Sequence, residues 1–127
     1  MNVIDSSAWL EYFADGPNAS YFAPAIQDTR ELVVPQITLL EVFKRVYQQR
    51  GEGPALHAVA LMQRGQVIDL DGPLALLAAK LSADDKLPLA GGVVLASARR
   101  YDAALWTQDA DFEGLPNVRF RPKHTGG

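Results

Sequence analysis

The sequence predicts an α/β fold, a doubly wound parallel sheet of about five strands with helices on both faces. Short segments that are apolar throughout alternate with longer segments of helical periodicity, and Gly, Pro and Asp residues separate them. Parallel strands need helical crossovers, and strands covered on both faces are apolar at every position. With 127 residues and 48% hydrophobic content, the chain can form one compact domain with its own core.

The chain begins with a strand, two helices and a second strand. Residues 2–5 form a short, mostly apolar run, and Ser6 then opens a helix that runs to about residue 13 with apolar side chains on one side. The turn-like residues 15–18 precede a helix over residues 20–27. Residues 32–34 form a buried strand that a proline ends. This order indicates successive strand–helix units.

The clearest helical period follows, where apolar residues recur at helical spacing between Thr38 and Gly51. We predict a helix over residues 38–50 and another that Pro54 opens and that runs through residue 62. The remaining predicted elements are a strand at 67–70, helices at 73–83 and 90–101, and strands at 103–106 and 118–120. We expect one domain over residues 1–121 and a flexible tail over residues 122–127.

Composition excludes several kinds of chemistry. The chain has no cysteine, so it has no disulfide, no thiolate zinc site and no thiol nucleophile. The formal charge of −3 argues against nucleic-acid binding through overall basicity, although local basic groups remain. No apolar run is long enough to span a membrane, and no leader-like segment precedes the first strand. We therefore expect a cytoplasmic protein. The local basic groups are Lys44, Arg45 and Arg50, and Arg99 with Arg100.

Three acidic residues are predicted to meet at one edge of the sheet. Asp5 ends the first strand, Glu41 lies in the first turn of the helix after the second strand, and Asp109 follows the fourth strand. Ligands of open parallel sheets bind beyond the carboxyl ends of the strands, where the strand order reverses. Clustered carboxylates repel one another unless a cation or protons neutralise them, and oxygen ligands suit Mg²⁺ or Mn²⁺. Such a site can activate water for attack on a phosphodiester.

Each acid also has a local explanation. Asp5 could cap the helix that follows it, and the residues from Thr38 to Glu41 match a capping box, in which the Glu side chain returns to the cap residue. Asp109 and Asp111 could serve a turn or a helix cap. Each local role is the better explanation of a residue taken alone, but three caps have no reason to gather at one switch point.

Three segments resemble a known family of nucleases. VIDSSAWLEYF at the amino end, PQITLLEVFKRV in the middle and KLPLAGGVVLASARRYDAALWTQDADF near the end are similar to the PIN-domain toxins called VapC. The resemblance covers nearly the whole chain and carries the family's acids onto Asp5, Glu41 and Asp109, with Thr107 and Asp111 as auxiliary residues. It implies the Rossmann-like PIN fold and a Mg²⁺-dependent endoribonuclease that a cognate antitoxin blocks, with Mn²⁺ as a substitute metal.

One position departs from the family pattern. Family members have Asp where this chain has Gly91, so the third of four acids is missing. Asp84 and Asp85 precede the next turn and are expected to close the preceding helix, which leaves Asp111 as the better replacement. The departure keeps a second interpretation open, a catalytically impaired PIN-fold module that binds RNA or antitoxin without cutting.

The resemblance also implies a homodimer. Tyr12, Phe13, Tyr21 and Phe22 supply more apolar surface than a chain of this size is expected to bury, which favours the same interpretation.

Two other classes fit less well. A receiver domain of bacterial signalling would need paired acids after the first strand, a phosphoacceptor Asp after the third and a Lys after the last, whereas Asp5 stands alone and Lys123 falls in the predicted tail. A nucleotide-cofactor site would need a spaced glycine loop after a strand, which Gly91 and Gly92 do not provide.

Overall fold

The computed structural model describes residues 1–124 and has five parallel strands in one sheet, as predicted. The strand order is β3-β2-β1-β4-β5. The strands are β1 (Asn2–Ile4), β2 (Leu32–Pro35), β3 (Gln66–Ile68), β4 (Ala104–Thr107) and β5 (Val118–Phe120). The chain therefore builds the sheet outward from β1 in one direction and then crosses to the other side for β4 and β5, which places the switch point between β1 and β4.

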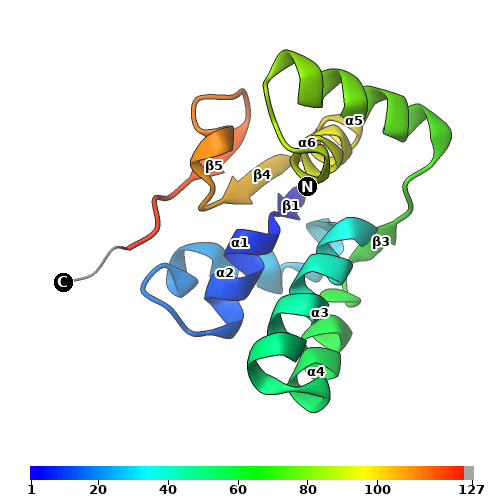
Figure 1. Cartoon of the computed structure of the whole chain (residues 1–127). Helices are drawn as coiled ribbons and strands as arrows, with labels where there is room; N and C mark the ends of the chain where they lie inside the picture. Colours follow the sequence, from blue (N-terminus) through cyan, green and yellow to red (C-terminus); the bar gives the residue numbers. More distant parts are fainter. Residues whose placement is uncertain (125–127) are drawn as a thin grey trace.

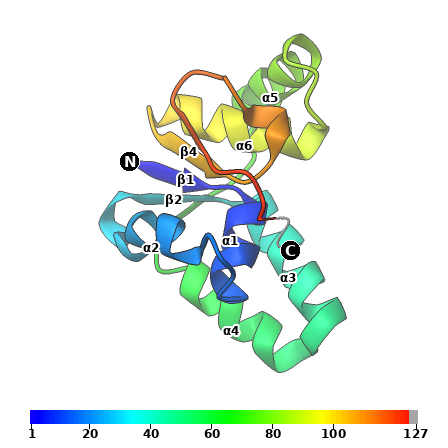
Figure 2. The ribbon, with the colours of Figure 1, turned by 90° about the vertical axis from the view of Figure 1, so that its left-hand side faces the viewer.

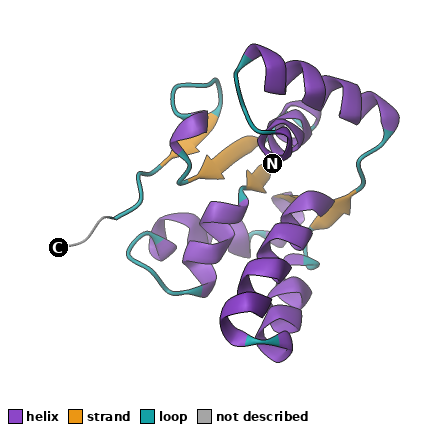
Figure 3. Cartoon of the chain, in the orientation of Figure 1, coloured by secondary structure: helices purple, strands orange, loops and turns teal. Residues whose placement is uncertain are grey.

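Six α-helices are present among residues 1–124, and they cover both faces of the sheet (Figure 1). They are α1 (Ser6–Phe13), α2 (Ala19–Gln27), α3 (Gln36–Arg50), α4 (Glu52–Met62), α5 (Gly72–Asp84) and α6 (Leu89–Arg100). Helices α5 and α6 pack together on one side of the sheet, and the other four lie on the opposite side (Figures 2 and 3). None of these helices is long and apolar enough to cross a membrane.

Adjacent strand residues point to opposite faces and build two cores. Val3 and Val33 pack under α5 and α6, whereas Ile4 and Val34 pack under the other helices. This alternation explains why each strand is apolar at successive positions. Tyr12, Phe13 and Tyr21 are partly buried against the second core, and Phe22 is fully buried. The prediction that these four aromatic residues supply excess exposed surface is therefore wrong.

Helix α3 begins two residues earlier than predicted, and the capping box does not form. Pro35 occupies the N-cap position, and the Thr38 hydroxyl donates to the Pro35 carbonyl oxygen at 2.7 Å. Glu41 consequently lies in the second turn of the helix, not the first, and its side chain is free for another role. The other element ends agree with prediction to within about two residues, which is ordinary variation in helix and strand assignment.

The contact between α5 and α6 depends on Gly92. A Cβ atom at this position would lie 2.5 Å from the backbone oxygen of Ala78, so only glycine permits this close approach. The approach fixes the start of α6 against α5. Asp84 and Asp85 end α5, as predicted. Of the predicted tail, residues 125–127 lie outside the described residues, and the Pro122 carbonyl accepts a hydrogen bond from Asn18 at 2.9 Å.

Candidate metal and phosphodiester site

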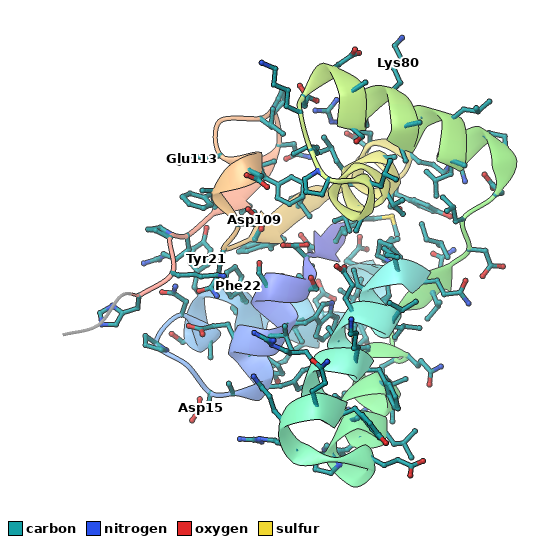
Figure 4. All side chains as sticks on the ribbon, viewed as in Figure 1. Asp15, Tyr21, Phe22, Lys80, Asp109 and Glu113 are labelled. Atoms are coloured by element: carbon teal, nitrogen blue, oxygen red, sulfur yellow. The ribbon has the colours of Figure 1, made fainter. Side chains whose placement is uncertain are left out.

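The three predicted acids line one cavity at the carboxyl ends of β1 and β4. The cavity has a volume of about 340 Å³. Asp5 reaches it from the end of β1 and Glu41 from α3. Asp109 reaches it from the segment that leaves β4, and Figure 4 labels this residue. Asp111 and Gly91 line the same cavity. The topological argument therefore located the acids correctly with respect to one another.

Two hydroxyl groups hold the Asp5 carboxylate. Ser7 Oγ donates to Asp5 Oδ2 at 2.8 Å, and Thr107 Oγ1 donates to the same oxygen at 2.9 Å. Asp5 occupies the N-cap position of α1 without a capping hydrogen bond from its side chain, so its predicted cap role is wrong. Because Asp5 is 6% exposed, burial raises its pKa, the hydroxyl hydrogen bonds oppose the rise, and the charge of Asp109 adds to it.

Glu41 is electrostatically coupled to Asp5. Partial burial raises the pKa of Glu41, the negative charge of Asp5 raises it further, and a hydrogen bond from Ser6 lowers it. The pKa shifts of both groups have the direction expected of carboxylates that are brought together without a cation. A divalent cation would relieve this repulsion.

Asp109 serves both the cavity and the turn that follows it. Its Oδ1 atom accepts a hydrogen bond from the Asp111 backbone at 2.9 Å, which confirms the predicted turn role for one carboxylate oxygen. The backbone N–H of Asp109 donates to Thr107 Oγ1 at 2.9 Å. Thr107 is fully buried, so a single hydroxyl links Asp5 and Asp109. Asp111 is exposed at the cavity rim.

Gly91 lies in the first turn of α6, on the wall of the acidic cavity. A Cβ atom here would lie 3.3 Å from Phe112 Cζ and 3.6 Å from Leu87 Cβ. A larger side chain would therefore need a small movement of the Phe112 ring.

A hydrogen-bonded network around Ser7 was not predicted. Ser7 Oγ accepts from the Gln108 backbone at 3.1 Å, and the Gln108 side chain accepts from Asn18 Nδ2 at 2.6 Å. The network ties α1, the loop before α2 and the end of β4 to one another. The spacing of Ser7 from Asp5 was a weak signal, and nothing in the sequence indicated the contact between Asn18 and Gln108, which lie 90 residues apart.

The donor set fits a hydrated divalent cation. Within residues 1–124, no group of three or more Asp, Glu or His side chains is tight enough to surround an ion directly. Mg²⁺ keeps several of its own waters and commonly takes only one or two carboxylates from the protein. The coupled pairs Asp5–Glu41 and Asp5–Asp109 meet that requirement.

A second cavity of about 470 Å³ adjoins the acidic one. It lies among α1, α3, α4 and the segment after β5, and its wall includes Phe13, Arg50 and His57. Four residues line both cavities: Ser7, Leu10, Arg45 and Lys123. The acidic site therefore opens onto a larger space that carries positive charge.

Comparisons with known proteins agree with this geometry. A family model for the PIN domain matches residues 3–118. A toxin–antitoxin complex from Klebsiella pneumoniae contains a similar chain, with a TM-score of 0.80 at 21% identity over 94% of this chain and 96% of that one. VapC20 of Mycobacterium tuberculosis, a toxin that cleaves the sarcin–ricin loop, has a TM-score of 0.78 at 18% identity over 96% of this chain and 100% of that one.

VapBC2 from Rickettsia felis, bound to a DNA fragment from its promoter, gives a TM-score of 0.72 at 13% identity over 95% of this chain and 97% of that one. Comparison with curated proteins gives no significant sequence match. At these identities the structural neighbours show a shared fold, and the fold implied by the sequence resemblance is confirmed.

Proposed function

Because this chain belongs to the PIN domain family, we propose that it is a metal-dependent endoribonuclease that acts as the toxin of a toxin–antitoxin pair. The observation that carries the proposal is the placement of Asp5, Glu41 and Asp109, from three separate segments, on the wall of one cavity at the switch point of the sheet. Such a gathering of like charges costs folding free energy, and strained electrostatics of this kind is typical of functional sites.

In this proposal Asp5, Glu41 and Asp109 hold Mg²⁺, or Mn²⁺ in its place. When bound, the ion would lower the pKa of a water so that a hydroxide nucleophile forms near neutral pH, and it would neutralise charge on the phosphodiester. The hydroxyl groups of Ser7 and Thr107 fix the orientation of the Asp5 carboxylate. Thr107 also fixes the backbone of Asp109, and Asp111 assists from the rim. Outer hydrogen bonds of this kind keep metal ligands in place.

Gly91 supports a second candidate, a module that binds RNA or antitoxin but cuts slowly or not at all. The position lines the acidic cavity, and it carries no carboxylate in this chain. Loss of one ligand weakens metal binding, and a weakly held metal lowers the rate of cleavage.

We also propose an antitoxin partner, a homodimer and a cytoplasmic location, where an RNA substrate is available. Structural neighbours of the fold come from toxin–antitoxin complexes, which supports the partner. An antitoxin arginine can pair with the carboxylates of the acidic cavity through a bidentate contact.

The test is an assay of the purified chain on a mixed RNA pool, with Mg²⁺, with Mn²⁺ and with EDTA. Cleavage that requires metal and is lost in Asp109→Asn supports the nuclease. RNA binding without cleavage in either metal favours the binding module. Equal cleavage in EDTA and in metal would exclude the proposed mechanism.

A further inference from the structure

The boundary between the acidic cavity and the larger cavity carries two cations from distant parts of the chain. Arg45 lies on α3, one turn after Glu41, and Lys123 lies on the segment that follows β5. Both line both cavities, and both are exposed. Among the residues that line the acidic cavity they are the only cations, within the described part of the chain.

Neither cation forms an ion pair with a carboxylate of the described residues. The ion pairs formed within residues 1–124 are those of the Met1 amino group with Glu31 and of Arg100 with Asp71. Arg45 and Lys123 therefore stand beside four acidic residues of the cavity without an ion pair to any of them. Their donor groups remain available to a ligand.

The segment that carries Lys123 is held against the end of β4 and against the start of α2. The Arg121 backbone N–H donates to the Thr107 carbonyl at 3.0 Å, and the Arg121 guanidinium stacks over the Tyr21 ring at 4.3 Å. Asn18 donates to the Pro122 carbonyl at 2.9 Å and to Gln108 at 2.6 Å. The residues just before Lys123 are thus tied to the same network that orients Asp5.

RNA can approach the acidic cavity only if nearby cations offset the repulsion between its phosphates and the acids. An RNA strand carries a negative phosphate at every nucleotide, and it must approach a cavity lined by four acids on a chain of net charge −3. Cations at the entrance compensate that repulsion locally and hold the backbone in register. The wall of the larger cavity adds a further cation, Arg50, and one acid, Glu11.

We propose that Arg45 and Lys123 form a phosphate clamp, which binds an RNA backbone phosphate at the boundary of the two cavities and positions the adjoining phosphodiester at the acids. The clamp rests on the proposed nuclease function and adds the residues that position its substrate. Both are positioning residues, because neither belongs to the acidic metal site.

The test measures RNA binding in EDTA, so that it does not depend on cleavage. A fluorescent single-stranded RNA oligonucleotide is titrated with the wild-type chain, Arg45→Gln, Lys123→Gln and the double variant, over a range of salt concentrations. Matched controls are Arg64→Gln and Lys80→Gln, which remove the same charges from exposed positions outside both cavities; Figure 4 shows Lys80 on α5, pointing away from Asp109.

Each clamp variant should lower the slope of log affinity against log salt by about 0.7, the value for one phosphate contact on single-stranded nucleic acid. That slope corresponds to about a fivefold loss of affinity at 0.1 M salt relative to 1 M, and the double variant should lose no more than about 0.7 because both side chains bind the same phosphate. A residue with only a structural role would not change the salt dependence.

The proposal is overturned if the clamp variants match the controls in affinity and slope, or if the wild-type chain does not bind the RNA. It is supported if the slopes fall in the clamp variants alone. Absence of cleavage in Mg²⁺ and Mn²⁺ with a clamp-dependent slope would reject the nuclease function while it supports the clamp, so the two failures are distinguishable.

Discussion

Two opposed effects act on the Asp5 side chain, because burial raises its pKa while the hydrogen bonds from Ser7 and Thr107 lower it. Burial and the neighbouring Asp109 raise its pKa above the ordinary value. Below the pKa of the unfolded chain the carboxyl is protonated in both states, and its charge costs no folding free energy. As the pH rises through the folded-state pKa, the buried group ionises and stability is lost.

We therefore predict that Asp5→Asn raises the free energy of unfolding at neutral pH in EDTA, and that the gain shrinks as the pH falls toward about 4, near the ordinary pKa of Asp. The same variant should lose metal-dependent cleavage. Urea unfolding at several pH values measures the first effect, with the exposed Asp111→Asn as control. A folded Asp5→Asn chain that still cleaves RNA with metal would exclude Asp5 from the site.

Thr107 offers a second test at the residue scale. Thr107→Val keeps the shape of the side chain but removes the donor to Asp5 and the acceptor of the Asp109 N–H. We predict a loss of about 10–100-fold in metal affinity or cleavage rate. An unpaired buried group should also lower the free energy of unfolding by about 1–3 kcal/mol. Unchanged Mn²⁺ affinity by calorimetry would contradict the orienting role.

Gly91 is the position where the family pattern and the sequence disagree. We predict that Gly91→Asp increases Mn²⁺ affinity and RNA cleavage, because the new carboxylate would enter the acidic cavity. It should not raise stability in EDTA, since it adds like charge and brings Cβ to 3.3 Å from the Phe112 ring. Gly91→Asn is the matched control, with nearly the same shape and no charge. Equal metal affinity and equal rates in the Asp and Asn variants would show that this position does not supply the missing ligand.

At the scale of elements, the α5–α6 contact can be tested at Gly92. We predict that Gly92→Ala lowers the free energy of unfolding by about 1–3 kcal/mol, because its Cβ would lie 2.5 Å from the Ala78 backbone oxygen and force the helices apart. Gly91→Ala, one residue away in the same helix, is the control and should be close to neutral, since a gain in helix propensity of about 1 kcal/mol is offset by the tight contact of its Cβ, 3.3 Å from Phe112 Cζ. Urea unfolding of both variants measures the difference. Equal stabilities would mean that the close approach is not required.

The alternation of strands and helices was predictable because the helices are long enough to show their periodicity and short, mostly apolar strands separate them. The start of α3 was not predictable, because Thr38 and Glu41 match a capping box that would begin the helix at Thr38. In the structure Pro35 ends the strand and is itself the N-cap residue of the helix. The Thr38 hydroxyl bonds backward to Pro35 and cannot cap the helix. Local sequence cannot distinguish these two uses of a threonine.

The acids were predictable as a group because their positions follow from topology alone. Asp5 and Asp109 lie just beyond parallel neighbouring strands, and Glu41 lies in the helix after the strand on the other side of β1. The contacts that orient them were not predictable. They join residues about 100 positions apart, such as Ser7 and Gln108, and depend on the register between β1 and β4 and on the exact path of the loops.

At the scale of the whole molecule, the strand order places the site. Receiver domains share the size and layers of this chain but have the order 2-1-3-4-5, with the switch point beside a different pair of strands. The order here puts β1 at the centre, so one residue after it, Asp5, can meet groups from both halves of the sheet. The larger cavity adjoins this centre, which gives a long ligand a path to the acids.

The proposed homodimer needs a different basis from the aromatic residues, which are buried or partly buried in this fold. The exposed apolar side chains provide one. Leu76 is 75% exposed on α5, Leu89 is 73% exposed at the start of α6, and Leu40 is 61% exposed on α3, which packs against α6. We propose that a homodimer covers these three leucines.

We predict that the chain sediments as a dimer and that Leu76→Glu shifts it toward monomer. Burial of one leucine contributes about 1.5–3 kcal/mol, and a charge in its place adds a desolvation cost, so the dissociation constant should rise by at least about tenfold. Leu56→Glu on α4, where the leucine is 53% exposed, is the control and should leave the dimer intact. Sedimentation over a range of concentrations separates the cases: a strict monomer at all concentrations removes the dimer, and equal dissociation in both variants places its interface elsewhere.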